Sequence, residues 1–268
     1  MSTFRELHGG PDLLRLPNAW DAGSARLIES VGARAIATTS AGLAWSRGYP
    51  DGDALPREEL LASTREIARV IRVPLTVDIE GGYSDDPAAV AQVTTQLIDA
   101  GAVGINIEDG SGAPERLCAK IEAIKKSAAH SGVDLFINAR TDVYLRGIAT
   151  GETAVQEVVR RARGYREAGC DGLFVPRLAD SDQIAAVARA VGPLPLNLML
   201  VPGLPGDDML RQLGVRRLSA GAAIAQAALG RVHRLASALL AGRREELFTA
   251  SIEYGAMNSL FVRSAKSQ

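Results

Sequence analysis

The sequence contains little cysteine, few aromatic residues and almost no net charge. Of its 268 residues only two are cysteine, and Cys118 and Cys170 are far apart, with no CxxC or Cys/His spacing around them. This usage predicts a reduced, cytoplasmic protein. Cys118 lies on a helical pattern, and we interpret it as a small buried residue.

The balance of charge and hydropathy excludes two classes of partner. The net charge is −1, and no basic run interleaved with aromatic residues is present, which argues against nucleic acid. The first residues, MSTFRELHGG, are polar and contain no signal-peptide hydrophobic region. No apolar stretch approaches the length of a membrane span. What remains is the composition of a soluble globular protein, 47% hydrophobic and 23% charged.

Four segments share one pattern, in which a helical stretch ends at a glycine and an apolar, strand-like run follows. The glycines are Gly32, Gly101, Gly169 and Gly214. Glycine just after a helix can take the left-handed conformation without a steric cost. The first three are separated by about the length of two βα units, so the pattern predicts repeated helix–strand alternation.

Eight strands are predicted, with helical patterns between them. They cover residues 13–18, 34–40, 74–80, 103–108, 134–140, 171–176, 194–200 and 216–220. Apolar strands that alternate with helices indicate a parallel sheet covered on its faces. Eight such units in about 250 residues predict a (β/α)8 TIM-type barrel. The alternative fold is a doubly wound open sheet. It would carry GxGxxG in its first βα turn, where this chain has NAWDAGSA.

We expect one domain over residues 1–268, with the barrel at about 13–241 and a further helical segment at about 243–268. Within that segment, apolar residues recur at helical spacing, which suits a helix at an interface between subunits. Pro56 is expected at the first position of a helix.

Polar residues gather where the predicted strands end. In PLTVDIEGGYSDD, an apolar strand ends with Asp78 and Glu80, which are two apart and therefore point to one face. Carboxyl ends of barrel strands form the active-site face, and the next strand brings Glu108 there. Carboxylates packed together raise each other's pKa, a conflict that Mg²⁺ resolves. Arg140, on the following strand, can bind a substrate carboxylate or phosphoryl group.

Other polar residues receive structural interpretations. A single acid at a strand end is commonly a helix cap or a surface salt bridge, and Asp109 and Asp142 fit that description. The histidines His8, His130 and His233 fall near the N-terminus or in helical patterns, so we expect them at the surface or at helix ends.

Together, LPNAWDAGSARLIESVGARAIATTSAGLAWSRGYPDGD, VDIEGGY, GINIEDG and INARTDVYL resemble the isocitrate lyase/phosphoenolpyruvate mutase superfamily, in particular its small bacterial members. The resemblance runs from about residue 13 to about residue 221. It implies an α/β barrel whose last helix is swapped between the subunits of a homodimer or homotetramer. It also implies bound Mg²⁺ (or Mn²⁺), a small anionic carboxylate substrate, and chemistry at a C–C or P–C bond beside a carboxylate.

The resemblance further implies a role for individual residues. Asp78 resembles the direct Mg²⁺ ligand, and Glu80 and Glu108 resemble the acids that hold metal-bound waters. Asp51, in GYPDGD, matches an acid on the metal's water shell, and Arg140 matches the arginine that binds the substrate carboxylate. The remaining implied substrate contacts are the backbone N–H groups of Ser40, Ala41 and Gly42 and the side chain of Asn197.

Several departures from the family pattern leave the subclass open. The loop after the fourth strand, EDGSGAPERLCAK, lacks both the KKCGH motif of the lyases and the lysine and Asn-Ser pair of the mutase. After the sixth strand, Pro176 and Arg177 stand where the lyases have glutamate and the mutase histidine. Glu80 replaces the usual second aspartate.

From these residues and this resemblance we predict a Mg²⁺-dependent lyase that cleaves a C–C bond in a small 2-oxo or 2-hydroxy dicarboxylate through an enolate. Asp51 and Arg140 are the predicted catalytic residues. Oxaloacetate decarboxylation fits best, because it needs an electron sink more than a placed proton donor. The alternatives are a P–C bond enzyme, such as a phosphonopyruvate hydrolase or mutase, and a non-catalytic protein that binds 2-oxo acids.

Overall fold

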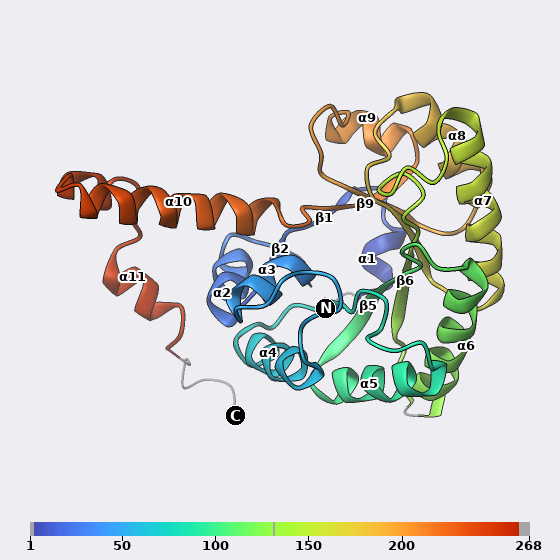
Figure 1. The fold of residues 1–268 in the computed structure, drawn as a ribbon, viewed down its shortest axis with the longest axis horizontal. Helices are drawn as coiled ribbons and strands as arrows, with labels where there is room; N and C mark the ends of the chain where they lie inside the picture. The colour runs from blue at the N-terminus through green and yellow to red at the C-terminus, as the bar shows by residue number, and fades with distance from the viewer. Residues whose placement is uncertain (1–2, 131, 263–268) are drawn as a thin grey trace.

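The computed structural model describes residues 3–130 and 132–262 as an α/β barrel with a helical arm (Figure 1). Every strand pairing is parallel, and the strands follow one another in the order β1-β9-β8-β7-β6-β5-β4-β3-β2. They are β1 (Leu14–Leu16), β2 (Asn18–Ala19), β3 (Ile36–Thr38), β4 (Leu75–Asp78), β5 (Ala102–Glu108), β6 (Phe136–Arg140), β7 (Gly172–Val175), β8 (Leu196–Met199) and β9 (Val215–Ser219). The predicted TIM-type barrel is confirmed.

Most of the helices surround the barrel, whereas α10 and α11 project away from it (Figure 1). They are α1 (Glu6–Gly9), α2 (Ala22–Ser30), α3 (Ser40–Ser46), α4 (Arg57–Val70), α5 (Pro87–Asp99), α6 (Pro114–His130), α7 (Gly151–Glu167), α8 (Ser181–Val191), α9 (Asp207–Gln212), α10 (Ala223–Leu240) and α11 (Tyr254–Ser259), with a 3-10 helix η1 (Arg244–Phe248). Pro56 is the residue before α4, with an extended ψ of 141°, and not its first helical residue as predicted. In the described parts of the chain, no helix combines the length and apolarity needed to cross a membrane.

The four glycines of the sequence repeat behave as predicted. Gly32, Gly101, Gly169 and Gly214 all have a positive φ, between 93° and 105°. Each therefore lets the chain leave a helix and turn into the following strand.

The barrel closes at Pro17, where the structure differs from the single strand predicted over residues 13–18. Proline has no N–H to give to a sheet, so the chain changes partner there. β1 pairs with β9, whereas β2 pairs with β3. The buried Asn18 holds this seam, because its Nδ2 donates to the Thr38 carbonyl at 2.8 Å and its Oδ1 accepts from the Gly221 N–H at 3.0 Å.

The outward and inward faces of the strands have different chemistry. Outward residues such as Val77, Ile105 and Ile107 are fully buried against the helices and form the main hydrophobic core. A smaller apolar cluster fills the barrel near the strand starts: Phe4, Leu7, Leu14, Leu16, Ala35, Ala37 and Phe136. Above it the interior is polar. Arg217 on β9 bonds Asn106 on β5, and since these strands are not neighbours, the bond crosses the barrel interior.

His8 lies at the end of α1, as expected, but it is buried there and not at the surface. Its ring stacks on Phe136 with centroids 4.1 Å apart and meets Phe4 edge-on. Burial, together with the charge of Arg217, lowers the His8 pKa to about 3, so the ring is neutral. His130 and His233 are exposed, as expected.

The C-terminal helices form an arm that leaves the barrel. α10 projects outward and α11 lies beneath it (Figure 1). The arm touches the barrel where Arg26 Nε on α2 donates to the Leu260 carbonyl at 2.7 Å. Large apolar side chains remain exposed along it, including Leu240 at 89% and Phe248 at 80%. The helical segment predicted for residues 243–268 corresponds to η1 and α11, and its last six residues lie outside the described ones.

We expect Asn18→Ala to destabilise the protein by about 2–4 kcal/mol, because it leaves a buried carbonyl and a partly buried N–H at the seam without their Asn18 partners. Urea unfolding followed by circular dichroism measures the change. Gln156→Ala is the matched control, since Gln156 is exposed and makes one long contact of 3.5 Å, to Glu152. Equal, small effects of both substitutions would show that Asn18 does not hold the seam.

Candidate active site

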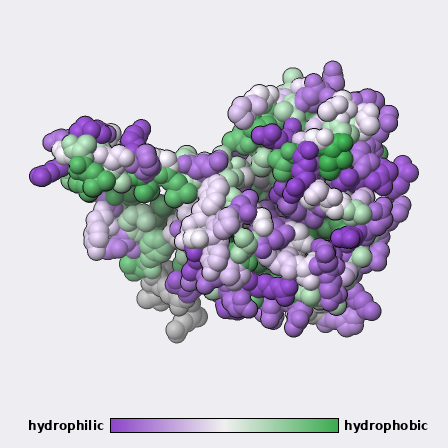
Figure 2. Space-filling model, viewed as in Figure 1, coloured by the Kyte–Doolittle hydropathy of each residue, from purple (hydrophilic) through white to green (hydrophobic). Residues whose placement is uncertain are grey.

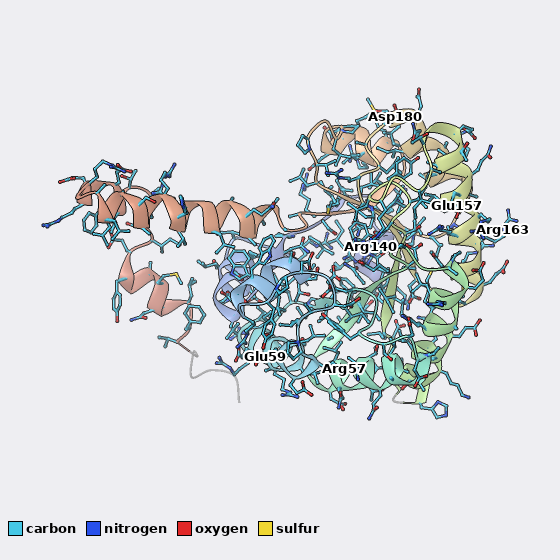
Figure 3. All side chains as sticks on the ribbon, viewed as in Figure 1. Arg57, Glu59, Arg140, Glu157, Arg163 and Asp180 are labelled. Atoms are coloured by element: carbon cyan, nitrogen blue, oxygen red, sulfur yellow. The ribbon has the colours of Figure 1, made fainter. Side chains whose placement is uncertain are left out.

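Three acids and one arginine meet at the mouth of the barrel. Asp78 is the last residue of β4, Glu80 follows it by two, and Glu108 is the last residue of β5. Arg140 ends β6 and is the register partner of Glu108. Its Nη1 lies 2.5 Å from Glu108 Oε2. Figure 3 labels Arg140 in the middle of the barrel, well inside the surrounding helices. The adjacent strand ends therefore bring Asp78, Glu108 and Arg140 to one rim, whereas Glu80 lies just beyond the end of β4.

Asp78 is held from both sides of the strand end. Its N–H donates to Thr38 Oγ1 at 2.8 Å, and its Oδ1 accepts from the Glu80 N–H at 3.0 Å. The residue is only 9% exposed. Burial raises the pKa of its carboxyl, and the positive charge of Arg140 opposes that shift.

Glu80 makes contacts that the sequence did not indicate. Its carboxylate accepts from the N–H groups of Gly52 and Asp53, and the Tyr83 hydroxyl donates to it at 2.9 Å. Glu80 therefore ties the GYPDGD loop to the end of β4. That loop carries Asp51, an exposed residue whose charge raises the pKa of Asp78.

The backbone at this rim is strained. Asp53, Glu80 and Tyr83 each have a φ between 50° and 57°, a region that non-glycine residues rarely occupy. Such strain persists only where surrounding contacts impose it, and it concentrates at functional sites. The hydrogen bonds of the Glu80 carboxylate, which join all three residues, supply those contacts.

Asp109 and Asp142 have structural roles, as expected, but most of their partners are buried rather than at the surface. Asp109 accepts from the Asp142 N–H at 2.9 Å, from Arg161 Nη1 at 2.8 Å and from the Tyr165 hydroxyl. Asp142, fully buried, accepts from Arg140 Nε at 2.7 Å. The two acids therefore hold Arg140 in place, because Asp142 accepts from its guanidinium and Asp109 in turn fixes Asp142.

The residues expected to contact substrate lie at different depths. Ser40, Ala41 and Gly42 form the first turn of α3, directly after β3, where backbone N–H groups have no partner within the helix. Gly42 is also needed for packing, because a Cβ there would lie 2.8 Å from Thr39 Cγ2. Asn197 is deep in the barrel and fully buried, and its Oδ1 accepts from Ser219 Oγ at 3.0 Å.

The acids fit a divalent cation bound mainly through water. Among residues 3–130 and 132–262, no three His, Cys, Asp or Glu side chains are close enough to ligate one ion together. Mg²⁺ commonly takes one or two carboxylates and keeps several waters, so Asp78 alone can serve as the protein ligand. The excess of negative charge supports a cation there. Burial, with the charges of Asp78, Asp142 and Glu80, raises the Glu108 pKa to about 8 despite Arg140.

An α/β barrel with acids and an arginine at the carboxyl ends of its strands has the architecture of an enzyme. The family model described as phosphoenolpyruvate phosphomutase matches residues 4–240, and the chain belongs to this family, within the isocitrate lyase/phosphoenolpyruvate mutase superfamily. It is accordingly a member of a class of lyases and mutases, with the subclass open.

Relatives and solved structures agree with this membership. The chain is 38% identical to the uncharacterized protein Rv1998c of Mycobacterium tuberculosis over 97% of its own length and 96% of the relative's. It is 28% identical to a 2-methylisocitrate lyase of Bacillus subtilis (72% of this chain, 64% of the relative) and 27% identical to an oxaloacetate decarboxylase of Pseudomonas entomophila (80% and 75%). A crystal structure of a putative lyase/mutase from Burkholderia cenocepacia is 37% identical, with a TM-score of 0.86 over 97% of this chain and 94% of that one.

The raised pKa of Glu108 gives stability a pH dependence whose sign can be stated. The folded state keeps a proton up to about pH 8, whereas an unfolded glutamate loses it near pH 4.3. Between these values the folded state binds more protons, so the free energy of unfolding falls as pH rises. We expect Glu108→Gln to reduce this fall.

Urea unfolding in EDTA at about pH 5.5 and about pH 8.5 measures the slope. Glu58→Gln, at an exposed position on α4, should keep the wild-type slope. A wild-type slope in Glu108→Gln would contradict the raised pKa.

Proposed function

We propose that the chain is a Mg²⁺-dependent lyase that cleaves a C–C bond in a small 2-oxo or 2-hydroxy dicarboxylate, with oxaloacetate decarboxylation as the best-fitting reaction. The observation that carries this proposal is the meeting of Asp78, Glu108 and Arg140 at one strand-end rim. The likeness to relatives named 2-methylisocitrate lyase and oxaloacetate decarboxylase supports it.

Each residue of the rim would have a defined task. Asp78 would be the protein ligand of the ion, and Asp51, Glu80 and Glu108 would accept hydrogen bonds from its waters. When bound, Mg²⁺ would stabilise the negative charge that develops on the substrate's 2-oxo oxygen. Glu80 would also set the position of Asp51 through its bonds to the loop.

The guanidinium of Arg140 is oriented so that one of its nitrogens can bind a substrate carboxylate. Asp142 takes its Nε at 2.7 Å and its Nη2 at 3.2 Å, which leaves Nη1 facing Glu108. A substrate carboxylate would take the place of Glu108 at Nη1. The first-turn N–H groups of Ser40, Ala41 and Gly42 would donate to the remaining carboxylate oxygens, and Asn197 would contact the buried end of the substrate.

A thermal-shift screen of oxaloacetate, oxalate, 2-hydroxy acids and phosphonopyruvate, each with Mg²⁺ and with EDTA, tests the proposal. A ligand present at about 100 times its Kd should add roughly 2.7 kcal/mol of stability. We expect this shift with oxalate or oxaloacetate in Mg²⁺, and its loss in EDTA and in Asp78→Ala. Asp85→Ala, at an exposed position on the next loop, should keep it.

Product analysis then separates the three candidate functions. Mg²⁺-dependent release of pyruvate from oxaloacetate would establish the C–C lyase. Release of phosphate from phosphonopyruvate would select the P–C enzyme, and a shift without turnover under any metal would select a 2-oxo acid binding protein. No shift, or one indifferent to EDTA, would refute the metal site.

We also propose that the arm joins copies of the chain into a homodimer or homotetramer. Its exposed apolar residues are too many for a solvated segment: Leu229, Val232, Leu239, Leu240, Phe248, Ile252, Tyr254, Phe261 and Val262. Figure 2 shows hydrophobic residues gathered along the lower side of the arm. Exposed apolar surface of this extent marks an interface.

Light scattering coupled to size exclusion should therefore give the mass of two or four chains. Leu240→Asp combined with Phe248→Asp should shift the protein towards a single chain, because each carboxylate would be buried unpaired at the interface. Arg234→Asp puts the same acid at an exposed polar position of α10 and should leave the mass unchanged. A wild-type mass of one chain would refute the proposal.

A further inference from the structure

A fully buried arginine lies inside the barrel, near the predicted metal ligand. Arg217 on β9 has no exposed surface, and no carboxylate of the described residues lies within ion-pair distance of it. Its Nη1 has no hydrogen-bond partner in the described structure. Burying a charge in this way costs more than burying an apolar side chain of the same volume. A residue that breaks the rules of core packing without a local gain is a candidate for function.

Asn106 connects this arginine to Asp78. Its Oδ1 accepts from Arg217 Nη2 at 3.1 Å and from Asn138 Nδ2 at 2.9 Å. Asn106 is also the register partner of Asp78 on β4, and its side chain lowers the pKa of the Asp78 carboxyl. These contacts form a continuous path across the barrel, from Arg217 on β9 through Asn106 on β5 to Asp78, the predicted metal ligand at the end of β4.

Among these residues, Arg217 is the one that fixes the orientation of the Asn106 amide. The amide of Asn138 could rotate and offer its oxygen, but a guanidinium can only donate. The oxygen of Asn106 must therefore face Arg217, and its NH₂ group must face Asp78. With the oxygen turned the other way, Asn106 would present an acceptor to a carboxylate and a donor to a cation.

We propose that Arg217 is a positioning residue for the metal ligand: by donating to Asn106 it fixes that amide with its NH₂ group towards Asp78, and so holds the Asp78 carboxylate ready to bind the metal. This inference rests on the proposed function, because it takes Asp78 as the ligand. Two donors, the Asn106 NH₂ group and the Glu80 N–H, then hold Asp78 and leave its other lone pairs for the ion. Residues that orient a metal ligand typically change metal affinity by about 10- to 100-fold when removed.

The test measures Mn²⁺ binding to the full-length, substrate-free protein by electron paramagnetic resonance of the free ion. We expect Arg217→Met to weaken Mn²⁺ binding by about 10- to 100-fold while the unfolding temperature stays equal or rises, since a buried charge has been replaced by an apolar side chain. A purely structural role would give the reverse, a lower unfolding temperature with unchanged Mn²⁺ affinity.

A matched control and a double-mutant cycle test the route through Asn106. Thr76→Val removes another buried group without a partner, the Thr76 hydroxyl, and should leave Mn²⁺ affinity unchanged. Asn106→Ala should weaken binding as much as Arg217→Met does. Adding Arg217→Met to Asn106→Ala should then have no further effect, because the two residues act as one unit.

Two results would overturn the inference while leaving the proposed function intact: unchanged Mn²⁺ affinity in Arg217→Met, or a full additional loss in the double variant. Failure of the wild-type protein to bind Mn²⁺ would overturn both the inference and the metal site. If Arg217→Met does not fold, Arg217→Gln, which is polar but too short to reach Asn106, is tested with the same expectation.

Discussion

Negative charge buried at the mouth of the barrel is the constraint to which the rest of the site responds. Burial and mutual repulsion both favour protonation of Asp78 and Glu108, and the raised pKa of each carboxyl records this. Arg140 supplies one positive charge and is shared between Glu108 and Asp142. Arg217, deeper in the barrel, makes no ion pair with these acids, so a cation that arrives with or before an anionic substrate would complete the site.

This concentration of charge is tolerated because most of the apolar core lies outside the barrel, between the strands and the helices. The outward faces of the strands pack against the helices and form the main core, whereas the apolar cluster inside closes only the end near the strand starts. The space between that cluster and the mouth can then hold Asn106, Asn138, Asn197 and Arg217. In many barrels of this fold, branched apolar side chains fill the same layers.

The sequence predicted the parts of this arrangement that follow from periodicity. Helix–strand alternation predicted the barrel. Two-residue spacing predicted Asp78 and Glu80 on one face of a strand end, but β4 ends at Asp78 and the Glu80 carboxylate turns to the loop at Gly52 and Asp53. It could not predict contacts across the barrel, because the strand that faces another depends on closure and stagger and not on local pattern. In the motif GVRRLSAG, Arg217 therefore has the pattern of an ordinary charged residue of a strand, with no signal of its position inside the barrel. The break at Pro17 was visible in the sequence, and the absence of a proline N–H was the signal that one strand would become two.

Glu80 stands where the family usually has an aspartate, and the structure gives a physical reason for the longer side chain. Its extra methylene, compared with aspartate, suits a carboxylate that must leave β4 and accept from Gly52 and Asp53. The left-handed backbone at Glu80 turns the side chain towards that loop, and the Tyr83 hydroxyl fixes the second oxygen. With both oxygens engaged, Glu80 acts first on the loop, and through the loop it sets where Asp51 stands relative to Asp78. If Asp78 holds the metal as proposed, the change from aspartate to glutamate would move the control of the metal's surroundings from the strand end to the GYPDGD loop.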